Sequence, residues 1–287
     1  MEPRLQRRVQ RYGWDLAAAS YESLWRAQLA CVQDKLLECA ALAPGQHVLD
    51  VACGTGLVAF AAAKAVGRDG RVVGVDLSGR MVEVARMRAR HRNVSSITFA
   101  RMDAEALEFP DATFDTVVCA LGLQYMPDPG LALREMRRVL RPGGRVSLAV
   151  WGERSRCSWA GVFPIVAAEV ESGMCPLFFR LGENDTLARL CAEQRLTPVE
   201  QHRMASTLRY ADASDACNAA LAGGPVALAW SRFGDDVRAR VRRRYKEAIA
   251  PWRRDRGYRI PGEFVIVAAT ASATATSGSV IEAAHTC

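Results

Sequence analysis

The sequence predicts an α/β fold built on a doubly wound parallel sheet, and two observations support this prediction. Over residues 47–151, short apolar runs alternate with helical segments at the spacing typical of strand–helix–strand units. The first apolar run ends in a glycine-containing loop that opens a helix, a position where such sheets bind ligands. The chain has 287 residues, of which 50% are hydrophobic, so it can bury a core of this kind. Right-handed crossovers then place helices on both faces of the sheet.

The first half of the chain contains five expected strands with helices between them. The break Ala43-Pro44-Gly45 precedes the first strand, and Arg141-Pro142-Gly143-Gly144 ends the last helix of this half. Apolar runs rich in valine mark the strands, whereas alanine-rich and arginine-rich segments mark the helices. We expect strands at 47–52, 71–76, 96–101, 113–121 and 145–151, and helices at 57–66, 78–90 and 131–140.

The flanking segments are expected to form caps around this unit. Residues 1–42 have a helical pattern in which Trp14, Tyr21 and Trp25 share a face, so the aromatic side chains either pack on the core or cover a ligand. The tail 270–287 is small, polar and of low complexity, and we expect it to be disordered. The division is therefore an N-terminal helical cap at 1–42 and a main domain at 43–269 with cap insertions at about 152–195 and 212–256. Within the second half we expect helices at 158–172, 185–195, 212–222 and 235–250, a polar strand at 199–210 and a buried strand at 263–269.

Charge and cysteine content exclude some classes of protein. The net charge is +7, but 35 of the 38 basic residues are arginine, which points to coding bias as much as to a nucleic-acid partner. The nine cysteines are scattered, with no Cys-x-x-Cys pair and no Cys/His cluster at zinc spacing, so we expect reduced thiols and no metal. No stretch approaches the roughly 20 apolar residues of a membrane helix. No secretory signal is visible, and we therefore expect a cytoplasmic protein.

A carboxylate strengthens the interpretation of the glycine loop. Gly54 and Gly56 lie between the first strand and the first helix, where the backbone can approach a ligand closely. Asp76 follows 20 residues after Gly56, at the end of the second strand, where a carboxylate can accept hydrogen bonds from both hydroxyls of a ribose. At this point a nicotinamide dinucleotide and S-adenosylmethionine fit equally well.

Two further acids separate these two ligands. Asp50 lies inside the first loop, where it would repel a pyrophosphate and attract an ammonium group. Asp103, beside Ala104, follows the third strand and can accept a hydrogen bond from an adenine amino group. A ligand with a ribose, an adenine and an ammonium but no phosphate is S-adenosylmethionine.

These motifs resemble one enzyme family. VLDVACGTG (48–56), VVGVDLSGRMVEVAR (72–86) and MDAEALEFPD (102–111) are similar, in order and spacing, to the class I S-adenosylmethionine-dependent methyltransferases. FDTVVCALGLQYMPD (114–128) and LREMRRVLRPGGRVSLAVW (133–151) extend the resemblance, which is closest to the small-molecule branch of the ubiquinone/menaquinone biosynthesis C-methyltransferases. The resemblance implies a Rossmann-like sheet of seven strands in the order 3-2-1-4-5-7-6, with the last strand antiparallel and helical cap insertions.

The resemblance also implies roles for individual residues. Asp50, Ala52, Gly54 and Gly56 would surround the methionine part of the cofactor, and Asp76 would bind its ribose. The remaining implied cofactor contacts are Leu77 and Met81 against the adenine face, Asp103 and Ala104 at the adenine edge, and Leu121 near the sulfonium. The reaction would be an in-line SN2 transfer of the methyl group to an oxygen, nitrogen, carbon or sulfur nucleophile, which leaves S-adenosylhomocysteine.

The acceptor stays open at this stage. The sulfonium already makes the methyl group electrophilic, so the enzyme has mainly to align the acceptor with it and to exclude water. No catalytic residue is therefore assigned. Candidates for the acceptor pocket are Tyr21, Gln124, Tyr125 and His202. Alternatives are an RNA or protein acceptor with the same cofactor, a non-catalytic cofactor-binding module, and a nicotinamide dehydrogenase, against which Asp50 argues. The arginine-rich segment 238–259 is either a solvated helix face or a surface that binds an acidic substrate, RNA or a membrane. The sequence is compatible with both a monomer and a homodimer.

Overall fold

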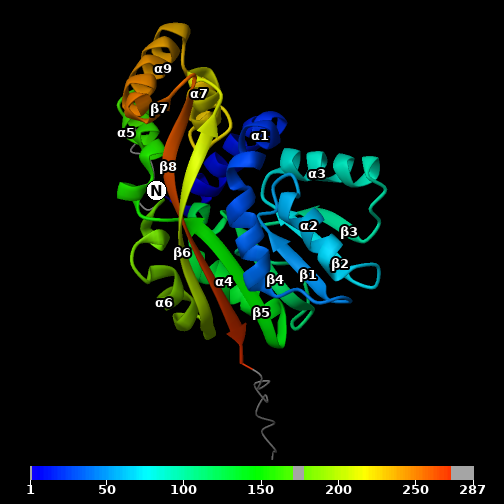
Figure 1. The fold of residues 1–287 in the computed structure, drawn as a ribbon. Helices are drawn as coiled ribbons and strands as arrows, with labels where there is room; N and C mark the ends of the chain where they lie inside the picture. Colours follow the sequence, from blue (N-terminus) through cyan, green and yellow to red (C-terminus); the bar gives the residue numbers. More distant parts are fainter. Residues whose placement is uncertain (1, 171–177, 273–287) are drawn as a thin grey trace, which may run out of the picture.

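The structure, a computed structural model, describes residues 2–170 and 178–272. A single twisted sheet runs through the molecule and carries helices on both faces (Figure 1). Most of the tail expected to be disordered, from 273 onward, lies outside the described residues. Its first two residues, Thr270 and Ala271, end a strand, because they continue the pairing of the buried strand before them. Among the described residues, no helix combines the length and the apolar character needed to cross a bilayer.

The strand order confirms the expected fold, with one addition. From one edge to the other, the sheet runs β3-β2-β1-β4-β5-β8-β6, which is the predicted order with β8 as the seventh long strand. β8 is antiparallel to both of its neighbours. The sheet has eight strands instead of seven, because the two-residue β7 pairs with β8. The strands are β1 (His47–Val51), β2 (Arg71–Asp76), β3 (Ile97–Arg101), β4 (Phe114–Ala120), β5 (Leu140–Trp151), β6 (Leu196–Tyr210), β7 (Arg253–Arg254) and β8 (Gly257–Ala271).

Two apolar cores lie on opposite faces of the sheet. Successive residues of β1, such as Val48 and Leu49, point into different cores, because side chains alternate between the two faces of a sheet. One core joins the sheet to α1, α2, α3, α5 and the helices α7–α9, and the other joins it to α4 and α6. The helices are α1 (Pro3–Ala40), α2 (Leu57–Val66), α3 (Gly79–His91), α4 (Pro129–Val139), α5 (Val162–Ala167), α6 (Thr186–Glu193), α7 (Ala213–Leu221), α8 (Ala227–Arg232) and α9 (Asp235–Ile249).

The cap departs from the sequence expectations in three places. The helix expected at 158–172 is a 3-10 turn, Ser158–Gly161, followed by the short α5; residues 171 and 172 lie outside the described part. Pro164 explains the division, because proline is accepted only in the first turn of a helix. Helix α8 was not expected, and β8 begins six residues earlier than expected, at Gly257. Strands β6 and β8 are each 15 residues long. Helices α7 and α9 lie near the end of this pair where β6 finishes and β8 begins (Figure 1).

Helix α1 runs across one face of the sheet from its carboxyl edge to its amino edge. Near the carboxyl edge, the indole Nε1 of Trp25 donates to the carbonyl of Gly223 at 2.8 Å. Further along, Leu36 is fully buried and its carbonyl accepts from Ser147 Oγ at 2.8 Å. At the amino edge, Arg145 Nε donates to the carbonyl of Cys39 at 2.6 Å. The first half of α1 therefore lies beside the loops where ligands bind in such sheets.

Candidate cofactor and acceptor site

A cavity opens at the carboxyl edge of the parallel strands, under the first half of α1. The loops after β1, β2, β3 and β4 form one side, and side chains of α1, β5 and the segment before α8 form the other. Ten residues singled out in the sequence line it: Tyr21, Ala52, Gly54, Asp76, Leu77, Met81, Asp103, Ala104, Leu121 and Tyr125. The order of the strands explains this convergence, because loops that are distant in sequence follow neighbouring strands.

Four other candidates do not line the cavity. Asp50 is 1% exposed and lies behind the cavity, as the next-to-last residue of β1 and not in the loop where it was expected. Gly56 caps α2 at φ +84°, and a Cβ there would come within 2.9 Å of the Phe99 ring. Gln124 is buried behind the wall, where neither atom of its amide meets a partner among the described residues. The expectation that His202 faces the cavity is wrong: it lies on β6, on the surface near the opposite edge, with its Nε2 3.4 Å from Glu200 Oε2.

Asp76 holds the glycine loop and retains capacity to accept more hydrogen bonds. Its Oδ2 accepts from the backbone N–H of Gly54 and its Oδ1 from that of Ser78, both at 2.8 Å. Burial raises the pKa of this carboxyl to about 6, although the two N–H donors oppose the shift. Each carboxylate oxygen can accept a second hydrogen bond, so the pair of hydroxyls of a ribose has two acceptors here.

Asp50 is a buried acid without a hydrogen-bond partner. Neither of its oxygens accepts a hydrogen bond from the described residues. The N–H of Ala59 is nearby but does not meet hydrogen-bond geometry. Burial, and then the nearby Asp76 carboxylate, raises the pKa of Asp50 well above its ordinary value. A buried acid of this kind is costly unless a cation or a bridging water accompanies it. A cation or a water molecule beside the glycine loop would therefore stabilise the ionised form of Asp50.

An ion-pair network closes the end of the cavity beside Asp103. Arg7 of α1 places its Nε 2.9 Å from Asp103 Oδ2 and also pairs with Glu105, whose side chain is only 2% exposed. Asp15 of the same helix accepts from Ser78 Oγ at 2.6 Å. Sequence reasoning missed Arg7 and Glu105, because nothing in the local pattern of α1 indicates which loop it crosses.

The other end of the cavity is aromatic. Trp14 packs edge-on against Tyr21 and Tyr125, with ring centroids 5.8 and 5.1 Å apart. Trp25, Trp151 and Trp159 continue the wall, and Trp159 Nε1 is buried without a partner among the described residues. Burial is the main reason that the pKa values of the Tyr21 and Tyr125 hydroxyls lie above their ordinary value, so both are neutral phenols.

Two non-glycine residues in the wall adopt left-handed backbone conformations. Ala52 has φ +57° and Leu121 has φ +59°, and they follow β1 and β4, which are neighbours in the sheet. The loops cross so closely that a Cβ on Gly122 would lie 2.3 Å from Ala52 Cβ. Such conformations are uncommon away from glycine and gather at functional sites.

Comparisons with known proteins agree with this geometry. Residues 48–144 match the family model of a methyltransferase domain. The ubiquinone/menaquinone biosynthesis C-methyltransferase UbiE of Cellvibrio japonicus is 38% identical over 133 residues, 46% of this chain and 51% of that protein. UbiE of Idiomarina loihiensis is 29% identical over 75% of this chain and 82% of that protein.

The fold is also found among solved structures. Geranyl diphosphate C-methyltransferase from Streptomyces coelicolor, solved with S-adenosyl-L-homocysteine, superposes with a TM-score of 0.53 at 17% identity, over 88% of this chain and 83% of that one. The chain spans about half the length of the first curated relative it matches. The chain therefore contains a methyltransferase domain over residues 48–144 and is similar to the UbiE enzymes over part of its length.

Proposed function

We propose that this protein binds S-adenosylmethionine and transfers its methyl group to a small, apolar acceptor in the cytoplasm. The observation that carries the proposal is a pair of carboxylic acids beside the glycine loop, of which Asp50 is buried and Asp76 is half-buried in the cavity wall. Asp50 lacks a partner among the described residues, and Asp76 has spare acceptor capacity. A ligand with an ammonium and a ribose but no phosphate satisfies both groups, whereas a dinucleotide would bring a pyrophosphate toward Asp50.

The residues around the cavity fit the whole cofactor. Asp50 would compensate the ammonium, with Ala52, Gly54 and Gly56 shaping the methionine site. Asp76 would accept from the ribose hydroxyls. The adenine would lie against Leu77 and Met81, with Asp103 and Ala104 at its edge. Leu121 would face the sulfonium, which supplies an electrophilic methyl group when the cofactor is bound.

The aromatic end of the cavity supports a small apolar acceptor. Trp14, Trp151 and Trp159 exclude water and restrict the orientation of a bound ring or hydrocarbon. Tyr21 and Tyr125 are neutral, so they can donate hydrogen bonds to an acceptor and do not serve as bases near neutral pH. The chain's contribution is thus alignment and desolvation.

A nucleic-acid acceptor receives less support from the arginine-rich segment 238–259. Arg240 and Arg244 pair with Glu169, which lies just after α5. Arg243 pairs with Glu247 on its own helix. Arg242 donates to Asn218 and lies over the Trp230 ring. These contacts suit a solvated helix face that also joins α9 to its neighbours.

Labelled methyl transfer tests the proposal. The purified protein is incubated with methyl-labelled S-adenosylmethionine and either small-molecule fractions of a cell extract or total RNA. We expect label in an organic-extractable product, with a rate nearly independent of salt. Label in RNA, lost steeply as salt is raised, would contradict the small-molecule assignment. Cofactor binding without product in any fraction would contradict the enzymatic one.

A further inference from the structure

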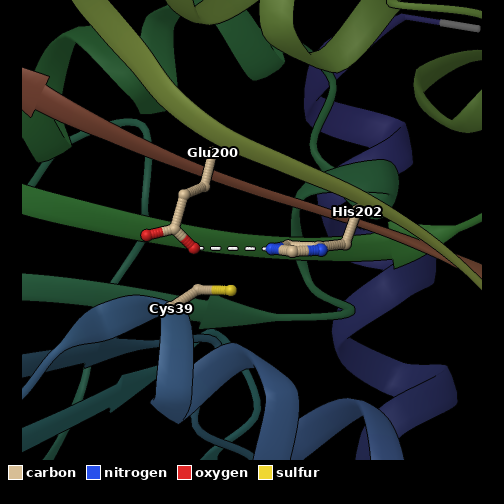
Figure 2. Close-up of side chains that lie close together, drawn as sticks. All are labelled: Cys39, Glu200 and His202. Carbon is tan, nitrogen blue, oxygen red and sulfur yellow. Dashed lines mark hydrogen bonds and ion pairs between the residues drawn. The ribbon is translucent and has the colours of Figure 1, made fainter.

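A cluster of three metal-ligating side chains lies at the amino edge of the sheet, away from the cavity. Cys39 comes from the last turn of α1, and Glu200 and His202 come from β6. Figure 2 shows the three side chains pointing toward one another. Their potential ligand atoms all lie within 4.8 Å of one another. Glu200 and His202 are two residues apart on a strand, which places them on the same face of the sheet.

The spacing of these atoms suits a metal better than it suits a hydrogen bond. Glu200 Oε2 and His202 Nε2 are 3.4 Å apart, at the long limit for a hydrogen bond. Bonds of about 2.0–2.2 Å around a tetrahedral zinc ion place neighbouring nitrogen and oxygen ligands roughly 3.3–3.5 Å apart. One cation between the carboxylate and the imidazole would therefore fit without moving either group, and the Cys39 sulfur, which lies within 4.8 Å of both atoms, would have to move closer.

Neighbouring groups orient the carboxylate. Arg145 Nη2 binds Glu200 Oε1 at 2.7 Å, which leaves Oε2 directed at His202. The same arginine donates to the Cys39 carbonyl, so β5 fixes the positions of both α1 and β6 at this point. Contacts of this kind, outside the ligands themselves, are what hold ligands in place in known metal sites.

We propose that Cys39, Glu200 and His202 bind a zinc-type divalent cation, with water as the fourth ligand. Thiolate, imidazole and carboxylate together are the donor set that zinc and cobalt(II) accept, and calcium and magnesium do not favour it. Glu200 and His202 are partly exposed, so solvent reaches the fourth position. On binding, the Cys39 S–H bond gives its proton to solvent and the sulfur bonds to the metal.

The site would join α1 to β6 and is independent of the proposed methyl transfer. Its residues are far apart in the sequence, at positions 39, 200 and 202, which explains why no zinc spacing is visible there. The cavity-lining residues of α1 end at Leu29, ten residues or about 15 Å of helix before Cys39. Metal binding is therefore expected to raise thermal stability and to leave S-adenosylhomocysteine binding unchanged.

Cobalt(II) titration of the reduced full-length protein tests the proposal. We expect one equivalent to produce thiolate-to-cobalt charge-transfer absorption together with the visible bands of four-coordinate cobalt, and zinc to displace both. Cys39→Ser and His202→Gln should weaken cobalt binding at least about tenfold, with Cys39→Ser also removing the charge-transfer band. His202 is partly exposed, so His202→Gln tests the site without altering the core.

Matched controls are available elsewhere in the chain. Cys31, exposed on the same helix, and His91, exposed at the end of α3, lie outside the cluster. Cys31→Ser and His91→Gln should retain the full spectrum. The proposal is overturned if wild type gives no charge-transfer band, if Cys39→Ser and His202→Gln bind cobalt as wild type does, or if a control variant abolishes the band.

Discussion

At the scale of single residues, the account depends on how closely two loops approach. The loop after β1 and the loop after β4 meet at Ala52 and Gly122, and both Ala52 and Leu121 have positive φ. The resemblance to the methyltransferase family implied that Ala52 and Leu121 would both contact the cofactor, and the structure places them after neighbouring strands. The resemblance did not predict their backbone conformations, which depend on the contact between the loops.

Gly122→Ala is predicted to destabilise the protein by about 1–3 kcal/mol, because the added methyl would overlap Ala52. Gly79→Ala is the matched control. Gly79 is the first residue of α3, and an added Cβ there meets only the flexible Arg101 side chain, at 3.8 Å, so its unfolding free energy should be unchanged or slightly higher. Chemical denaturation measures both variants. Equal stability of the two variants would show that the loops are not in contact.

The raised pKa of Asp76 predicts how cofactor binding depends on pH. Its pKa is about 6 in the folded, ligand-free protein, compared with 3.8 for the unperturbed group, so the folded state binds this proton more tightly. Between these values the ionising carboxylate destabilises the ligand-free fold as pH rises. A ribose needs the carboxylate, so S-adenosylhomocysteine affinity should be constant above pH 6 and fall below it, at most about tenfold per pH unit for one proton.

Calorimetry between pH 5 and 8 measures this dependence, with Asp76→Asn as the comparison. The variant cannot ionise at this position, so it should bind more weakly and lose the part of the pH dependence that Asp76 contributes. An affinity that stays flat from pH 8 to pH 5 in wild type would be inconsistent with a carboxylate of raised pKa at the ribose.

At the scale of elements, α1 connects the two ends of the molecule. Its buried residues pack on the sheet, and its first half covers the cavity through Arg7, Trp14 and Tyr21. The sequence predicted a helix at 1–42 and the shared aromatic face, because helical periodicity is local. The partners of that face, including Trp151 and Trp159, come from distant segments and could not be predicted from spacing. His202 was misplaced for the same reason: a strand pattern does not indicate where along the sheet each residue lies.

Leu36→Ala should cost about 2–5 kcal/mol of stability, because Leu36 is fully buried between α1 and the sheet. Leu16→Ala removes the same atoms from the same helix, but Leu16 is 52% exposed, so a change within about 0.5 kcal/mol is expected. Thermal or urea unfolding distinguishes them. Similar losses in the two variants would mean that the second half of α1 is not docked.

At the scale of the whole molecule, function is expected at one edge of the sheet. The cavity, the two acids and the aromatic wall gather at the carboxyl edge, and the Cys39–Glu200–His202 cluster lies toward the amino edge. The fold class followed from the alternation of strands and helices, and the strand order followed from the resemblance to the methyltransferase family. Eight strands instead of seven, and the broken helix after Ser158, arise from the cap, where the sequence pattern is less regular.

The most direct test is calorimetric binding of S-adenosylhomocysteine to wild type, Asp76→Ala and Asp69→Ala at pH 7.5. Asp69 is an exposed acid in the turn before β2 and serves as the control. We predict that wild type and Asp69→Ala bind equally and that Asp76→Ala loses about 1.5–3 kcal/mol, the value of a hydrogen bond to a charged group. Absence of binding by wild type, or equal binding by all three proteins, would contradict the cofactor assignment.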